Sequence, residues 1–196
     1  MKQSSNREPR FKSLLRYAIF FSLLVTVYCS LPTAVSAQSR DYFTEEEIEL
    51  VREAQQIDLR MDVLTKAIDR RFAVLNINVG GGKAAAGKEW GELPKGSRAE
   101  LLSDIHNILQ KAVDDIDNLA SRPDSMVIDP NVDKKKQKGF SELFPKAVHK
   151  LADAAKRYEP ALKQTLDTTK DDHEKGLITN TIDLCDEIIA SVSKLK

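Results

Sequence analysis

Residues 82–88 (GKAAAGK) have the G-x-x-x-x-G-K spacing of a phosphate-binding loop. In such a loop, backbone N–H groups cradle the phosphates of a nucleotide, and the lysine neutralises part of their charge. The motif also requires a Ser or Thr after the lysine to hold magnesium, and a helix that begins there. Glu89 occupies that position, and Gly91 and Pro94 follow closely, which disfavours a helix. We therefore expect a flexible glycine-rich loop here and no nucleotide site.

Other residues able to do chemistry lack the spacing that a site needs. The three histidines, His106, His149 and His173, have no acidic residue three positions before them, as di-metal helical proteins require. His149 and Asp153 can share a helix face, but a metal needs three or four converging ligands. One acidic group does not have the spacing of a calcium loop: Asp114, Asp115 and Asp117. No nucleophile motif is present either, so we predict no metal, no cofactor and no enzymatic activity.

Two features could contact a partner. Trp90 is the only tryptophan, and either it anchors its loop on the protein interior or it offers its ring to a partner. A basic run in a second loop is either a solvated segment or a contact for anionic lipid head groups or another polyanion; its members are Lys134, Lys135, Lys136 and Lys138. No aromatic residue lies among these lysines, so we expect no nucleic-acid partner.

The first 37 residues have the organisation of a secretory signal peptide. Five basic residues and one acidic residue precede an uncharged stretch over 17–37, which ends in the small-residue pattern V-S-A. We predict cleavage between Ala37 and Gln38, and hence a periplasmic or secreted protein. Two alternatives stay open: an uncleaved leader that anchors the chain in a membrane, and lipid attachment at Cys29.

Cleavage would leave residues 38–196 as one domain of 159 residues, with 25 basic and 29 acidic side chains and a net charge of −4. A mildly acidic protein of this size suits a single packed core. Cys185 is then the one cysteine left, so no internal disulfide can form. It falls on an apolar helical stripe, and we therefore predict a buried core residue rather than a reactive thiol.

Four segments have helical periodicity. The first spans 44–75 and begins with a capping box at Thr44. Its apolar positions recur every three or four residues without interruption, which predicts one continuous helix. The second begins with a capping box at Ser97 and ends before Pro123.

The third segment runs from about Pro145, a residue that suits the first position of a helix. Pro160 lies inside its pattern and should kink or divide the helix, because proline removes a backbone donor. The fourth segment spans about 172–195, with apolar residues every three or four positions.

Four amphipathic helices bury four apolar stripes most simply as a four-helix bundle, so the predicted fold class is all-α. The first helix would be about 48 Å long, and we expect one of its ends to overhang the bundle. The connections over 76–96 and 122–144 are much longer than is usual in bundles. They can run the length of the bundle, so up-down-up-down and up-up-down-down orders are both possible.

Three stretches resemble a set of small uncharacterised secreted bacterial proteins: 43–72 (FTEEEIELVREAQQIDLRMDVLTKAIDRRF), 89–105 (EWGELPKGSRAELLSDI) and 142–163 (ELFPKAVHKLADAAKRYEPALK). The resemblance covers most of the chain after residue 37 and consists of helical patterns. It implies a bacterial, extracytoplasmic helical protein, and it brings no activity and no site residue with it.

Two functions therefore fit the sequence. The first is a non-catalytic interaction or scaffold protein, which acts on an unidentified protein partner through a surface or a long loop. The alternative is a carrier that holds an apolar ligand between helices, because small residues on the stripes could leave room there: Ala54, Ala112, Ala154 and Ala155.

Overall fold

The computed structural model describes residues 40–81, 85–125 and 139–195. The chain divides into two units, 1–40 and 41–196, and the fold given below is that of the second unit. The predicted signal peptide, its cleavage site and Cys29 lie outside the described residues. The described ranges contain helices and no strand, which confirms the all-α class.

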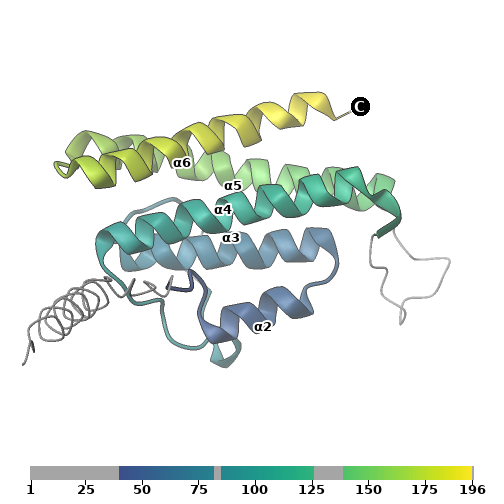
Figure 1. Ribbon diagram of the computed structural model, residues 1–196, viewed down its shortest axis with the longest axis horizontal. Coiled ribbons are helices and arrows are strands. Elements are labelled where there is room, and N and C mark those ends of the chain that lie inside the picture. The colour runs from purple at the N-terminus through teal and green to yellow at the C-terminus, as the bar shows by residue number, and fades with distance from the viewer. Residues whose placement is uncertain (1–39, 82–84, 126–138, 196) are drawn as a thin grey trace, which may run out of the picture. The chain divides into compact units, whose positions relative to one another are not determined.

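The described residues form five α-helices and three short 3₁₀ turns (Figure 1). The helices are α2 (Glu45–Glu53), α3 (Ile57–Val74), α4 (Arg98–Ser121), α5 (Phe140–Thr168) and α6 (Asp172–Ser191). The 3₁₀ turns are η1 (Lys88–Trp90), η2 (Pro123–Ser125) and η3 (Val192–Lys194). None of the helices in these ranges combines the length and the apolar character needed to cross a membrane.

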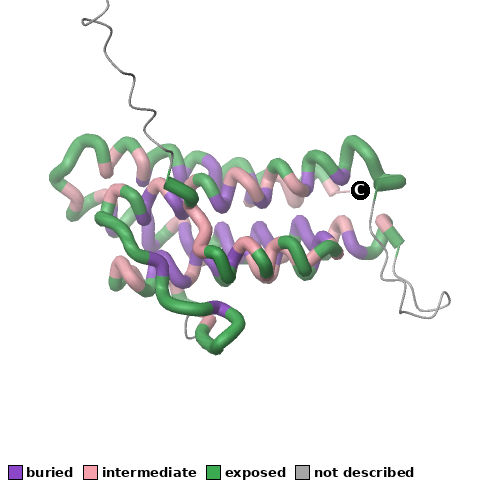
Figure 2. Tube along the Cα trace, turned by 60° about the horizontal axis from the view of Figure 1, so that its bottom comes forward, coloured by how far each residue is buried: buried purple, intermediate pink, exposed green. Residues whose placement is uncertain are grey.

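The four long helices pack around a shared apolar interior. α3 contacts α4 and α5, and α6 contacts the same two helices. Buried residues lie on the sides of the helices that face one another, while exposed residues lie on the outside (Figure 2). Each helix contributes fully buried side chains, among them Met61, Phe72, Ile108, Leu109, Tyr158, Leu162, Ile178 and Cys185.

Ion pairs between helices establish their relative directions. Three pairs between α3 and α5 join residues at a constant separation of 88 positions: Asp58–Lys146, Asp62–Lys150 and Asp69–Arg157. A constant separation requires that the two helices run parallel. Two pairs between α3 and α4 run in the opposite order: Arg60–Asp115 and Arg71–Asp104. α3 to α6 therefore follow an up-down-up-down order (Figure 1), one of the two orders that the sequence allowed.

Asp58 is the fully buried residue among the three pairs between α3 and α5. Its carboxylate accepts hydrogen bonds from Lys146 Nζ and from the side-chain amide of Gln56. Burial by itself raises the pKa of this carboxyl group, but the hydrogen bonds from Gln56 and Lys146, together with the charges of Lys146 and Lys150, lower the pKa further than burial raises it. The folded protein therefore holds Asp58 in its charged form.

The prediction of one continuous helix over 44–75 is wrong. Ala54 leaves helical geometry with a ψ of 70°, and α3 begins only at Ile57. In a continuous helix Glu47 and Arg71 would lie about 36 Å apart at 1.5 Å per residue, yet their side chains bond at 2.6 Å. α2 therefore folds back along α3, and the expected overhang does not occur. The apolar spacing continues across the break, so periodicity gave no sign of it.

The other helix boundaries agree with the sequence more closely. The capping box at Ser97 is confirmed at the start of α4. α5 begins at Phe140 rather than near Pro145, and the rings of Phe140 and Phe144, one turn apart, stack at a centroid distance of 4.8 Å. Pro160 lies inside α5 without dividing it, because a proline removes only one of the many backbone bonds of a long helix.

Candidate functional site

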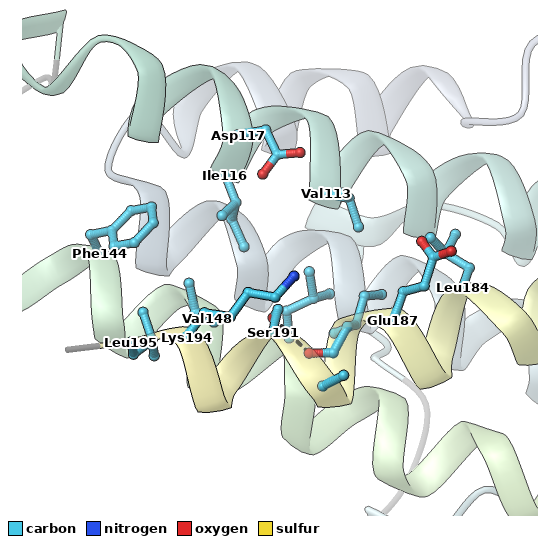
Figure 3. Close-up of a pocket in the computed structure, with 13 residues that line it drawn as sticks. Val113, Ile116, Asp117, Phe144, Val148, Leu184, Glu187, Ser191, Lys194 and Leu195 are labelled. Atoms are coloured by element: carbon cyan, nitrogen blue, oxygen red, sulfur yellow. Dashed lines mark hydrogen bonds between the residues drawn. The ribbon is translucent and has the colours of Figure 1, made fainter.

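An apolar groove of about 650 Å³ lies between α4, α5 and α6, close to Leu195 (Figure 3). We call it the α4–α5–α6 groove. Its apolar lining consists of Val113, Ile116, Phe144, Val148, Leu151, Leu184, Ile188, Ala190 and Leu195. Its polar lining consists of Asp117, Glu187, Ser191 and Lys194. This volume, with mostly apolar walls and a few polar groups, is typical of a site for a small molecule.

The floor of the groove is continuous with the protein core. Ile116, Leu151 and Ile188 are 8%, 2% and 4% exposed, so they are buried core residues that also line the groove. At the other end of the same helices, Arg98 of α4 pairs with Glu174 of α6 at 3.1 Å. The groove thus lies at the end of α4 and α6 that is remote from this pair, and an apolar ligand there would extend the hydrophobic interior.

Charged side chains stand at the rim of the groove. Asp117 projects from α4, while Glu187 and Lys194 project from the α6 side (Figure 3). Within the described part of the chain, the side chains of these three residues form no hydrogen bond and no ion pair. Ser191 donates its hydroxyl hydrogen to the carbonyl oxygen of Ile188 at 2.7 Å, so its oxygen can still accept a hydrogen bond. The rim can therefore bind a polar head group.

The space between helices does not lie where the small residues suggested. Ala112, Ala154 and Ala155 are buried in the core, and Ala54 lies at the break between α2 and α3. None of the four lines the α4–α5–α6 groove. The groove opens instead between larger side chains, such as Ile116, Leu151 and Ile188.

A second notable cluster consists of four buried charges. Arg71 donates to both carboxylate oxygens of Glu47 at 2.6 and 2.7 Å and to the carbonyl oxygen of Tyr42 at 2.5 Å. Arg70 Nε lies 3.6 Å from the same carboxylate, and Arg71 Nε lies 3.8 Å from Asp104. These four charged side chains are at most 5% exposed, and their formal charges cancel. We call them the buried charge cluster; it joins α2, α3 and α4.

Arg70 also fixes the connection between α3 and α4. Its guanidinium donates to the carbonyl oxygens of Trp90, at 2.5 Å, and of Glu92. It lies 5.3 Å from the centroid of the Trp90 ring, a cation–π arrangement. Burial lowers the pKa of Arg70, and the charge of Glu47 opposes that change. Trp90 itself is 6% exposed, so the structure places this candidate partner contact inside the protein, where it anchors the connection.

The remaining sequence candidates are placed as follows. Lys134, Lys135, Lys136 and Lys138 lie outside the described residues. In the segment that resembles a phosphate-binding loop, residues 82–84 are also outside them. α3 ends at Val74, and residues 75–81, which precede this segment, form neither a helix nor a strand. A 3₁₀ turn occupies Lys88–Trp90, where the motif requires an α-helix.

The titratable residues singled out in the sequence do not come together. No three or more His, Cys, Asp or Glu side chains within the described ranges are arranged to hold a metal ion. The Nδ1 atom of His106 is buried and has no hydrogen-bond partner within the described residues, and burial lowers the pKa of the imidazole ring. Cys185 is fully buried, as predicted, and burial raises the pKa of its thiol to about 12. This thiol is therefore unsuited to nucleophilic chemistry.

Sequence reasoning missed the groove and its rim. In the sequence, Asp117 belongs to an acidic group that lacks the spacing of a calcium loop, and Glu187 and Lys194 belong to no motif. The one available signal is that all three flank apolar stripes, a position shared by many surface charges.

Comparisons of the chain with protein-family models, with curated proteins and with solved structures found no match.

Proposed function

We propose that this chain is an exported binding protein, in which α3 to α6 form a four-helix bundle that carries an apolar ligand in the α4–α5–α6 groove. The groove itself is the observation that carries the proposal, since it has about 650 Å³ of space and a mostly apolar lining. The leader pattern in residues 1–37 supports export. A periplasmic or secreted carrier of this kind needs no reaction chemistry.

The free energy of binding would come mainly from the hydrophobic effect. Apolar area removed from water contributes about 25 cal/mol per Å². The groove offers partly exposed apolar side chains such as Val113, Phe144 and Leu195, so an apolar chain placed there covers surface that otherwise faces water. The ligand would keep its polar end at the rim, near Asp117 and Glu187.

The other function that the sequence allowed, binding of a protein partner, gains no support from the described residues. Trp90 faces the interior, bonded through its carbonyl oxygen to Arg70. The lysine run over 134–138 lies outside the described residues. We therefore place the carrier function ahead of the interaction function.

Binding of a neutral apolar fluorophore, N-phenyl-1-naphthylamine, to protein recovered from an exporting host tests the proposal. We expect saturable binding at one site per chain, and displacement by dodecanol below its solubility limit. Ala190→Phe places a ring in the groove and should weaken binding at least tenfold. Ala73→Phe adds the same ring at an exposed position of α3 and should leave binding unchanged.

The melting temperature of both variants is measured alongside binding, so that loss of the fold is recognised. Two outcomes would overturn the proposal. One is the absence of saturable fluorophore binding to the folded parent. The other is equal affinity of the Ala190→Phe variant and the parent, because the ligand would then lie elsewhere.

A further inference from the structure

The electrostatics of the groove rim identify the class of ligand more closely, and this inference rests on the proposed function. We infer that the ligand of the α4–α5–α6 groove is an amphiphile with an apolar chain and an ammonium head group. The rim presents two carboxylates, Asp117 and Glu187, against one ammonium group, Lys194. Its net charge is therefore −1, and it favours a cation.

The two carboxylates stand on opposite sides of the groove. Asp117 belongs to α4 and lies beside Ile116, whereas Glu187 belongs to α6 and lies nearer Leu184 and Val113, so the two line the groove at different levels (Figure 3). Neither side chain has an ion-pair partner within the described residues. An ammonium group carries three donors, so a head group at the rim can bond to one of these carboxylates.

A helix end adds to this preference. Of the three helices, α6 brings its last turn to the groove, through Ile188, Ala190 and Ser191. The C-terminal end of a helix carries the negative end of its dipole, which has the same sign as the net charge of the rim.

Three probes with the same twelve-carbon chain test the inference: dodecylammonium, dodecyl sulfate and dodecanol. Each displaces N-phenyl-1-naphthylamine from the full chain at pH 7 and low salt, below the concentration at which micelles form. We expect dodecylammonium to bind about fivefold more tightly than dodecyl sulfate, since exposed charge pairs contribute modest energies. The ratio should fall towards one as salt screens the rim.

Charge-neutralising variants locate the preference. The double variant Asp117→Asn with Glu187→Gln should lose the preference for the cation. The double variant Asp167→Asn with Glu53→Gln makes the same change of net charge at exposed positions outside the groove, and it should keep the preference. Lys194→Gln should increase it.

The outcomes separate this inference from the proposed function. If dodecanol binds but the cation has no advantage over the sulfate, or if the control double variant also loses the preference, the ammonium inference is wrong and the carrier function stands. If the sulfate binds best, Lys194 dominates the rim and the inference is again wrong. If none of the three probes displaces the fluorophore, the proposed function fails and the inference fails with it.

Discussion

Replacing Glu47 by Met should cost a large share of the stability of the fold. Glu47 is fully buried and receives two charge-assisted hydrogen bonds from Arg71, at 2.6 and 2.7 Å. Its carboxylate also accepts from the backbone N–H of Thr44 at 3.1 Å, which caps α2. The substitution leaves the buried charge cluster with a net charge of +1. Breaking one partner of a buried pair costs about 3–5 kcal/mol.

Urea denaturation at pH 7 measures the free energy of unfolding directly. For a domain of this size, a loss of that magnitude lowers the melting temperature by roughly 6–20 °C. Glu53→Gln, an exposed position on the same helix, serves as the control and should change the free energy of unfolding by less than about 0.5 kcal/mol.

The double variant Glu47→Met with Arg71→Met returns the cluster to neutrality, with Arg70 and Asp104 left as its two charges. Apolar replacement of a whole buried pair is often neutral or stabilising, so the double variant should recover more than half of the loss. A loss below about 1 kcal/mol in Glu47→Met, or a double variant that is no more stable than the single one, would refute the argument from charge balance.

Three further predictions follow from other buried groups. The folded protein lowers the pKa of Asp58, so the ionised carboxylate stabilises the fold at pH values above the ordinary aspartate pKa of 3.8, and this stabilisation is lost as pH falls from 3.8 through the lower pKa of the folded protein. Asp58→Asn should therefore flatten the acid side of a plot of unfolding free energy against pH, and an unchanged slope would contradict this. In a Cys29→Ser background, Cys185 should react with a thiol reagent only after unfolding, because burial raises the pKa of its thiol to about 12; rapid reaction of the native protein would show that the core opens. Arg70→Met should shift the emission of Trp90 to longer wavelengths, since the connection loses its anchor; an unchanged spectrum would mean that packing alone holds the ring.

Local signals could predict most of the helices. The capping box at Ser97 requires only residues within one turn, and the stripe that contains Cys185 is a property of one helix. The break at Ala54 could not be predicted in this way. It depends on a bond between Glu47 and Arg71, which are 24 positions apart in the chain. A buried Glu on the first turn is indistinguishable in sequence from a solvated one, because acidic residues are common there.

The groove depends on several helices at once, which is why no single stripe predicted it. Ile116 and Ile188 satisfy the apolar periodicity of their helices equally well whether or not a gap separates them. The charges at its rim occur at ordinary flanking positions. Only the relative placement of α4, α5 and α6 distinguishes Asp117 and Glu187 from the many other exposed carboxylates.

The two ends of the α4–α6 pair suggest how a ligand would affect the fold. Arg98 and Glu174 join these helices by an ion pair at one end, whereas the groove lies between the helices towards the other end, with Asp117 on the α4 wall and Glu187 on the α6 wall. A ligand whose apolar chain fills the groove and whose ammonium group pairs with one of these carboxylates would add contacts between α4 and α6 at this end. Because such a ligand binds only the folded chain, it would stabilise the protein by about 2.7 kcal/mol at a concentration of 100 times its Kd. Ligand binding and the packing of α4 beside α6 would therefore stabilise each other at this end.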